Sequence, residues 1–266
     1  MKNVHTVFGA LALLLFVTGC STVPITGRKQ LSLISDAQLL PESAASYADV
    51  IKQGPLSQDQ AQTAMIQRAG ARISAAVERY FNERGRADVI AGFEWEFNLI
   101  EEDVPNAWCM PGGKVAFYTG ILPYTQDEAG VAVVMGHEVA HAIARHSNER
   151  VSHQMAVAGG GILTAWMAKD SEYQEAILAA YGIGAQVGGI LPYSRLHESE
   201  ADHMGLIFMA MAGYNPEEAV AFWQRMGTAG GQKPPEFLST HPADETRIRQ
   251  IREHLPEAMK YYTPVQ

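Results

Sequence analysis

Apolar residues recur at intervals of three and four along the stretch from Ala61 to Tyr80, with polar residues between them. This spacing places the apolar side chains on one face, so it predicts a long amphipathic helix that ends near Gly85. Ser57 and Gln60, three residues apart at the start of this stretch, form a capping-box pattern that would begin the helix. The helix is expected to be part of the scaffold.

Residues 93–100 instead alternate apolar and polar side chains over most of their length, which predicts a half-buried strand. Residues 114–120 predict a second strand, after a polar turn and a connecting segment rich in proline and glycine. Such a pair of strands can offer an edge to an extended peptide, which would pair through main-chain hydrogen bonds. A plain hairpin is the alternative.

Two apolar stretches, 156–168 and 176–191, are rich in glycine. Each is shorter than the roughly 20 apolar residues that a membrane-spanning helix needs, so neither is predicted to span a membrane. They are expected to form a helical hairpin packed over the core. The alternative is a flexible apolar flap near the site that touches lipid or unfolded substrate.

Three further helices are predicted towards the C-terminus. The first runs from Ser194 to Gly213, and the second opens at Asn215 with Pro216 in its first turn. A loop rich in glycine and proline follows at 227–235, and a last amphipathic helix runs through 248–251. The chain is therefore predicted to be α+β and mainly helical.

The candidate chemistry lies in a helix between the second strand and the apolar stretches. Residues 125–128 form another capping-box pattern, which predicts a helix that runs to about Asn148. Within it, His137, Glu138 and His141 form the pattern His-Glu-x-x-His in otherwise apolar surroundings. Buried polar groups need partners, and a metal ion supplies one.

The spacing of this pattern suits zinc-dependent peptide hydrolysis. Two histidines four residues apart project from the same face of a helix, so His137 and His141 can both reach one Zn²⁺ ion. Glu138 lies about 100° round the helix, where its carboxylate can hold a water on the metal and take its proton. An accidental match to a short pattern is the alternative.

A zinc ion that catalyses hydrolysis usually has three protein ligands, so a third is needed. Glu198 is the best candidate, because Glu198 and Asp202 are four residues apart on the predicted helix that starts at Ser194 and share one face. Asp202 could then accept a hydrogen bond from the far nitrogen of a ligand histidine. Glu200 points to the opposite side and is expected to be structural or solvated. Four other histidines are expected to be surface or core residues: His146, His153, His197 and His203.

Composition narrows the possible partners. The chain has 266 residues, 47% of them hydrophobic, which is enough for one sizeable domain with a real core. Its 20 Lys and Arg residues against 29 Asp and Glu residues give a net charge of −9. This balance argues against a nucleic-acid partner and gives no basic patch for anionic lipid.

The N-terminus predicts export. Lys2 precedes an apolar run at 7–17 that is too short to span a bilayer, and Val17-Thr18-Gly19-Cys20 follows it. This order is typical of a secretory signal peptide, with an ordinary N-terminal helix as the alternative. Its end resembles the lipobox of bacterial lipoproteins, which implies that Cys20 is lipid-modified and anchors the chain to a membrane. Ser21 after it implies the outer membrane, facing the periplasm.

The predicted organisation is a lipoprotein signal peptide over 1–19, a tether and packing segment over 20–55, and a zinc metallopeptidase domain over 56–266. If Cys20 carries lipid, only Cys109 remains, so no intrachain disulfide is expected.

The pairing of His137-Glu138-Val139-Ala140-His141 with Glu198-Ser199-Glu200-Ala201-Asp202 resembles the gluzincin metallopeptidases related to HtpX and the CAAX prenyl protease. The resemblance extends over about 23–251, and Thr26-Gly27-Arg28-Lys29-Gln30-Leu31 is similar to the soluble lipoprotein and Oma-type branches. It implies a zincin-like fold with a small antiparallel sheet beside the His-Glu-x-x-His helix. It also implies that Glu198 is the third zinc ligand.

Two further segments carry the resemblance. Pro105-Asn106-Ala107-Trp108 is similar to the substrate-side segment of the family, with Trp108 in place of a Phe-like aromatic, which implies that Asn106, Ala107 and Trp108 contact substrate. Thr240-His241-Pro242, with Arg247-Ile248 after it, resembles a C-terminal motif whose histidine lies near the site, which implies that His241 stabilises the tetrahedral oxyanion. HtpX and the prenyl protease have spanning helices that this chain lacks after its signal, so a prenylated substrate is not expected.

Together these observations predict a lipid-anchored periplasmic zinc endopeptidase with Glu138 as its general base. Its partners would be unfolded or misfolded envelope proteins, in protein quality control. Two alternatives stay open. One is a zinc-containing, chaperone-like or binding lipoprotein without turnover, and the other is an enzyme kept latent by the Gly-rich apolar segment or by the loop at 227–235.

Overall fold

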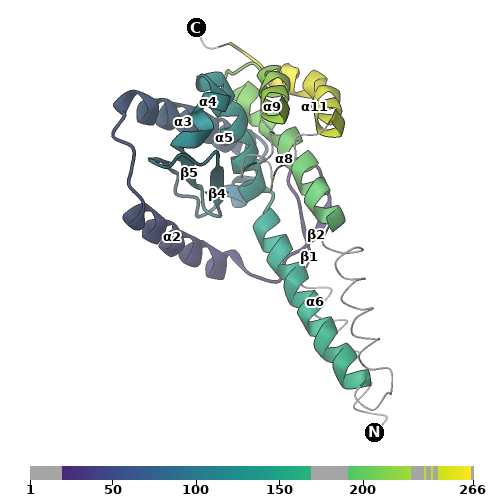
Figure 1. The fold of residues 1–266 in the computed structure, drawn as a ribbon. Coiled ribbons are helices and arrows are strands. Elements are labelled where there is room, and N and C mark those ends of the chain that lie inside the picture. The colour runs from purple at the N-terminus through teal and green to yellow at the C-terminus, as the bar shows by residue number, and fades with distance from the viewer. Residues whose placement is uncertain (1–19, 169–190, 229–236, 238–240, 242–244, 265–266) are drawn as a thin grey trace. The chain divides into compact units, whose positions relative to one another are not determined.

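The computed structural model describes residues 20–168, 191–228, 237, 241 and 245–264 (Figure 1). The predicted signal peptide over 1–19 lies outside the described residues, as do most of the apolar stretch at 176–191 and most of the loop at 227–235. The chain forms two compact units, 1–39 with 145–195 and 40–144 with 196–266. In the described part of the chain, none of the helices has the length and apolar character needed to cross a membrane.

The larger unit is built on a three-stranded sheet. Strand β3 (Glu96–Ile100) pairs in parallel with β5 (Lys114–Tyr118), and β4 (Ala107–Met110) pairs with β5 in antiparallel orientation. The order β3-β5-β4 makes β4 an edge strand of this sheet. The sequence predicted β3 and β5, whereas β4 falls in the segment predicted as a connection, because prolines flank it on both sides.

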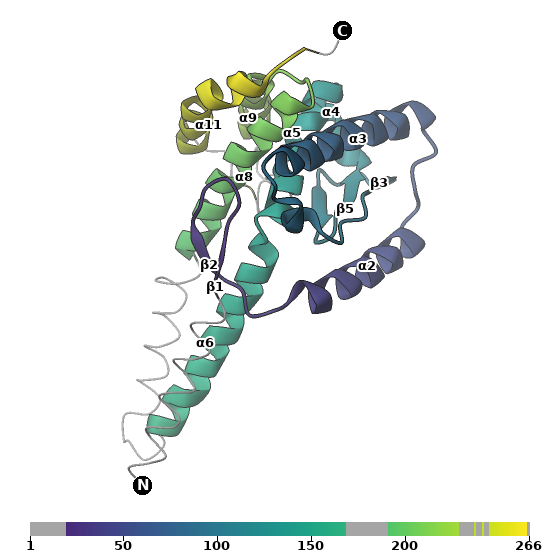
Figure 2. The same ribbon diagram turned by 180° about the vertical axis from the view of Figure 1, so that it is seen from behind.

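Helices cover both faces of this sheet. Helix α3 (Gln60–Glu83) crosses one face and packs on β3, where Gly70 leaves room for the ring of Phe97 (Figure 2). On the other face, Tyr47 of α2 (Asp36–Gln53) forms a small core with Ile100 and Ala116. Helix α2 lies within the segment predicted as a tether, and its residues from Leu40 onward belong to this unit.

Helix α5 (Glu128–Ile143) carries the His-Glu-x-x-His pattern and packs against α3 and β4. Its ends differ from the prediction. Asp127, not Thr125, caps the helix by accepting hydrogen bonds from the amides of residues 129 and 130, while the Thr125 hydroxyl donates to the Leu122 carbonyl. The helix stops at Ile143 because Arg145 adopts a left-handed conformation with φ of 59°.

The remaining elements of the larger unit follow the predicted order. The short helical elements are η1 (Ala87–Ile90), η2 (Thr119–Ile121), α4 (Leu122–Thr125) and η4 (Met259–Tyr261). The longer ones are α8 (Leu191–Met211), α9 (Glu218–Thr228) and α11 (Glu245–Ala258). Helix α3 is capped by Asp59 rather than by Ser57. The predicted fold class, α+β and mainly helical with a zincin-like arrangement, is confirmed. The sheet was predicted to be antiparallel but is mixed, because β3 and β5 run parallel and only β4 is antiparallel to β5.

The smaller unit pairs β1 (Cys20–Thr22) with β2 (Lys29–Leu31) in an antiparallel hairpin and adds α6 (His146–Ala168). Polar contacts fix the N-terminal segment to the start of α6. Arg28 makes two hydrogen bonds to the buried carboxylate of Glu149, and the Ser152 hydroxyl accepts one from the backbone amide of Leu33.

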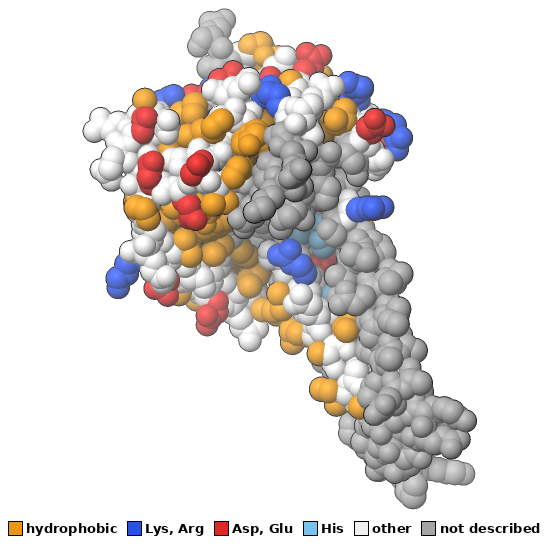
Figure 3. All heavy atoms as spheres, in the orientation of Figure 1, with side chains coloured by type: hydrophobic (Ala, Val, Ile, Leu, Met, Phe, Trp, Pro, Cys, Tyr) orange, Lys and Arg blue, Asp and Glu red, His pale blue; other side chains and the backbone are white. Residues whose placement is uncertain are grey.

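Helix α6 contains the first apolar stretch, which was expected to pack over the core. Its large apolar side chains are exposed instead, including Met155, Ile162 and Leu163, and apolar side chains line its surface in Figure 3. Ile162 is 73% exposed. The described part of this stretch is therefore not a core helix.

Candidate active site

Two of the three polar side chains of the His-Glu-x-x-His pattern on helix α5 are buried. His137 is 1% exposed and Glu138 is 4% exposed. His141, one turn after His137, brings its Nε2 to 3.0 Å from Nε2 of His137. The two imidazoles therefore converge on one point, as expected for residues four apart on one helix face.

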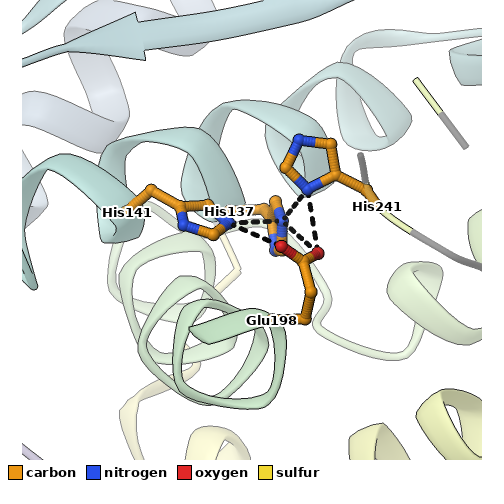
Figure 4. A group of neighbouring side chains, drawn as sticks. All are labelled: His137, His141, Glu198 and His241. Carbon is orange, nitrogen blue, oxygen red and sulfur yellow. Dashed lines mark hydrogen bonds and ion pairs between the residues drawn. The ribbon is translucent and has the colours of Figure 1, made fainter. Parts of the chain in front are cut away.

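Helix α8 brings a carboxylate to the same point. Glu198 Oε2 lies 3.3 Å from Nε2 of His137, and Glu198 Oε1 lies 3.3 Å from Nε2 of His141 (Figure 4). One turn further along α8, Asp202 Oδ1 lies 2.9 Å from Nδ1 of His137. The structure thus brings together on α5 and α8 the residues that the sequence predicted as a zinc site.

His241 also points into this cluster. Its Nδ1 lies 2.8 Å from Glu198 Oε2 and 3.1 Å from Nε2 of His137 (Figure 4). The ring of Phe237 stacks on His241 with 4.5 Å between the ring centroids. The resemblance implied only that His241 lies near the site. In the structure its Nδ1 also points to the same place as the donor atoms of the other three residues.

The donor set fits a zinc ion. The donor atoms of His137, His141, Glu198 and His241 all lie within 4.8 Å of one another, the one such group found in the described residues. A tetrahedral zinc ion with bonds of about 2.0–2.1 Å holds its ligand atoms about 3.3 Å apart. The observed separations of 3.0 to 3.3 Å on His137 match this spacing. Imidazole nitrogen and carboxylate oxygen are also ligands that zinc prefers.

The charges around the cluster follow from its burial. Burial and the charge of Arg247 lower the pKa of His137, but hydrogen bonds to Asp202 and Glu198 outweigh them and raise it to about 9. Burial alone would raise the pKa of Glu198, but the three histidines lower it strongly. Without a bound metal, these shifts favour a protonated His137 beside an ionised Glu198.

Glu138 lies beside the cluster without being part of it. Burial raises the pKa of its carboxyl group, although the charges of His241 and His137 oppose the rise. Its Oε1 lies 3.6 Å from Nε2 of His241 and has no hydrogen-bond partner in the described part of the chain. A buried carboxylate oxygen without such a partner is costly, which favours a functional reason for its position.

Arg247 on α11 is a site residue that the resemblance included in the C-terminal motif but to which the sequence assigned no role. It is 5% exposed, its Nη1 lies 3.1 Å from Glu198 Oε2, and its Nε and Nη2 each donate a 2.8 Å hydrogen bond to Asp202. Its guanidinium carbon lies 3.4 Å from the ring centre of Trp223 on α9. A signal was present, because Arg247 lies four residues before Ile251 and so shares the apolar face of this helix.

The predicted substrate-side residues lie at the edge of the sheet. Asn106 precedes β4 and Ala107 is buried in it. The side chain of Trp108 faces the α2 side, where its Nε1 donates to the Tyr118 hydroxyl at 3.2 Å and its ring meets Tyr47 edge to face. The backbone of β4 lies beside α5, whereas the Trp108 ring does not point toward the zinc cluster.

Other residues that could have been zinc ligands by their type are not part of the donor cluster. His203 Nε2 lies 2.8 Å from Glu257 Oε2, and the His203 ring stacks on His254. Glu200 is 5% exposed, so it is buried rather than solvated. Cys20 is exposed at the start of β1, and within the described part of the chain neither Cys20 nor Cys109 forms a disulfide. The predicted modification of Cys20 stays a prediction.

Comparison with known proteins identifies relatives. The mitochondrial metalloendopeptidase OMA1 of Schizosaccharomyces pombe is 39% identical over 70% of this chain and 53% of its own length. The Arabidopsis thaliana protein of the same name is 35% identical, covering 66% of this chain and 35% of its own length. A putative beta-barrel assembly-enhancing protease of Vibrio cholerae is 33% identical over 59% of this chain and 34% of its own length. The chain therefore spans about half, or less, of these curated relatives.

These relatives correct the predicted location. Six of the matching proteins, from fission yeast, Arabidopsis, budding yeast, cattle, human and zebrafish, are named as mitochondrial. The prediction of a bacterial outer-membrane lipoprotein facing the periplasm is therefore wrong. It depended on Lys2, the short apolar run at 7–17, the lipobox resemblance that ends at Cys20, and Ser21 after it. Mitochondrial targeting segments are also basic and poor in acidic residues. A basic N-terminal segment that is poor in acidic residues therefore does not distinguish a bacterial exported protein from a mitochondrial one.

A match to a family model supports the same relationship. A family model described as peptidase family M48 matches residues 66–255, which include all of α5, α8 and α9 and most of α3 and α11. The matched range contains the four clustered donors, Glu138 and Arg247. This chain belongs to peptidase family M48, a family of zinc-dependent metallopeptidases.

Proposed function

We propose that this chain is a zinc metalloendopeptidase that hydrolyses peptide bonds in protein substrates. The single observation that carries the proposal is the convergence of His137, His141 and Glu198 on one point, with Glu138 buried beside it. Bound there, zinc would act as a Lewis acid that polarises the scissile carbonyl and lowers the pKa of a water molecule.

Glu138 would serve as the general base and then as the acid. A general base works best when its pKa lies near the working pH. Burial raises the pKa of the Glu138 carboxyl group above that of a free carboxylate, in this direction. One of its oxygens has no hydrogen-bond partner among the described residues, so it can accept a proton from water and pass it to the leaving amine.

Asp202 would hold His137 in the form that binds metal. Because Asp202 lies 2.9 Å from Nδ1 of His137, it keeps the proton on that nitrogen and leaves Nε2 free as a ligand. Arg247 in turn holds both oxygens of Asp202, which fixes the orientation of this carboxylate.

The substrate would be an extended protein segment. Strand β4 is an edge strand beside α5, and a peptide can add to such an edge by main-chain hydrogen bonds. Recognition through the backbone favours unfolded or misfolded segments over folded ones, because a folded protein has already paired its main chain. A role in protein quality control follows from this substrate class.

A second candidate function has one observation in its favour. Nδ1 of His241 lies close enough to the other donors to be a fourth ligand, and four protein ligands are typical of structural zinc sites. In that case the chain would be a zinc-containing binding or chaperone-like protein without turnover, as the sequence left open. His241 as an oxyanion donor and His241 as a permanent ligand are distinguished by activity, since only the first permits it.

A comparison of two glutamates on the same helix tests the proposal. Glu198→Gln should lose both bound zinc and cleavage of unfolded casein, because it removes a ligand charge. Glu200→Gln is the matched control, since Glu200 is also on α8 and buried but is not in the donor cluster. Equal zinc content in both variants would overturn the assignment of Glu198, and zinc without cleavage in the wild type would favour the second candidate.

A further inference from the structure

Helices α5 and α8 approach most closely at a pair of glycines. A methyl group on Gly205 would lie 2.9 Å from the carbonyl carbon of Gly136 and 2.9 Å from the amide nitrogen of His137. A methyl group on Gly136 would lie 2.9 Å from the carbonyl oxygen of Gly205. These separations are well inside the 3.5–4.0 Å of ordinary carbon contacts, so the two backbones touch without room for any side chain.

This contact lies at the metal site rather than away from it. Gly136 directly precedes His137 on α5. On α8, Gly205 follows Asp202 by three residues and Glu198 by seven, so all three lie on one face of the helix. The spacing of the two helices at the glycines therefore sets how far Glu198 and Asp202 reach toward His137.

The distances across this crossing leave little tolerance. Asp202 Oδ1 is 2.9 Å from Nδ1 of His137, and Glu198 Oε2 is 3.3 Å from Nε2 of the same ring. Metal sites require ligand distances within about 0.2 Å of their ideal values. A side chain at either glycine would have to separate the backbones by more than this margin.

Helix α5 has no space to move aside. It packs against α3, α4, β4 and α9, and nearly all of its residues are buried. A group added between α5 and α8 would therefore displace α8, which carries Glu198 and Asp202, relative to the two histidines.

We propose that Gly136 and Gly205 are positioning residues of the metal centre, which set the α5–α8 distance at which Glu198 and Asp202 meet His137. The inference rests on the proposed function in that it takes the donor cluster to be a zinc site. It adds that the glycines determine the zinc affinity of the site, beyond any contribution to folding.

The test measures zinc affinity by competition with a chromophoric chelator, on purified folded protein. Gly205→Ala should bind zinc about tenfold or more weakly than wild type, which is the size of effect seen when residues behind metal ligands are displaced. Gly136→Ala is the milder variant, because its methyl group meets one atom at 2.9 Å and the next at 3.5 Å. If Gly205→Ala does not fold, the zinc affinity of Gly136→Ala is measured in its place.

Gly70→Ala is the control for general destabilisation. Gly70 is a buried helical glycine of the same unit whose methyl group would meet the Phe97 ring at 2.4 Å, away from the donor cluster. It should lower the melting temperature and leave zinc affinity unchanged.

The outcomes separate the inference from the function on which it rests. Wild-type zinc affinity in folded Gly205→Ala or Gly136→Ala, with a zinc-binding wild type, would overturn the positioning role alone. An equal loss of affinity in Gly70→Ala would also overturn it, because the effect would then follow stability. A wild-type protein that binds no zinc would overturn both.

Discussion

Arg247 and Asp202 form a buried bidentate ion pair, with Nε and Nη2 of the arginine each 2.8 Å from an oxygen of the carboxylate. Asp202 in turn lies 2.9 Å from Nδ1 of His137. The three residues come from α11, α8 and α5, so the pair couples the last helix of the chain to the candidate zinc ligands. Charge-assisted contacts of this geometry orient a carboxylate more firmly than a single hydrogen bond does.

Replacing Arg247 should therefore affect both stability and metal binding. Arg247→Ala leaves Asp202 buried without its partner, which costs about 3–5 kcal/mol of unfolding free energy for a pair of this kind. Zinc affinity should fall about 10–100-fold. Denaturant unfolding of the metal-free protein and a zinc titration measure the two effects.

Arg249→Ala is the control for this prediction, because Arg249 is on the same helix and its side chain is 67% exposed. It should change neither quantity by much. If Arg247→Ala matched this control in zinc affinity, Asp202 would not depend on the arginine for its position.

Zinc binding should strengthen as the pH rises. In the metal-free site His137 has a pKa raised to about 9, so below that pH it carries a proton that zinc must displace. The apparent affinity should rise by up to about tenfold per pH unit between roughly pH 7 and 9, as expected for the release of one proton. Calorimetric titrations in buffers of different ionisation enthalpy report the number of protons released, and none released at pH 7 would contradict the charge assigned to His137.

Glu128 should contribute stability that is lost in acid. Burial raises its pKa, but hydrogen bonds from Tyr214 and Arg68 and the nearby arginine charges outweigh this and lower it below 4.5. A lowered folded-state pKa stabilises the fold above the unfolded value and loses this contribution as the pH falls through the folded one. Glu128→Gln should thus melt lower than wild type at pH 7, and the difference should shrink as the pH falls below 4.5 and through the lowered folded-state pKa. A difference in melting temperature that stays constant from pH 7 to pH 3 would rule out this role.

Trp108 should matter for stability rather than for substrate affinity. Its ring packs against Tyr47 and its Nε1 donates to Tyr118, both on the α2 side of the sheet. Trp108→Ala should cost about 2–3 kcal/mol, somewhat less than a fully buried tryptophan. The KM of the Trp108→Ala variant should equal that of wild type. A large rise in KM with little loss of stability would show instead that Trp108 contacts substrate.

Local rules predicted much of the candidate site. The positions of His137, His141, Glu198 and Asp202 follow from residues four apart on two helices, and a helix fixes that geometry wherever it packs. The family resemblance added His241, which no local rule could place, because it is a single residue far along the chain.

Features that depend on tertiary packing were harder to predict. Arg247 shares the helix face of Ile251, but its partners Asp202 and Trp223 come from α8 and α9, which only the fold brings to it. Strand β4 lies between two prolines, and only its pairing with β5 makes it a strand. The end of α5 at Ile143 depends on the left-handed conformation of Arg145, a conformation that non-glycine residues rarely adopt and that sequence patterns do not signal.

The central claim is that Glu138 performs chemistry beside a zinc ion that it does not bind. The most direct test measures zinc content and casein cleavage in parallel for the wild type and Glu138→Gln, with zinc added and excess removed. The predicted result is one zinc per chain in both proteins and a loss of cleavage of about 100-fold or more in the variant, the contribution expected of a general base. Undiminished cleavage by Glu138→Gln, in a preparation free of other proteases, would contradict the account.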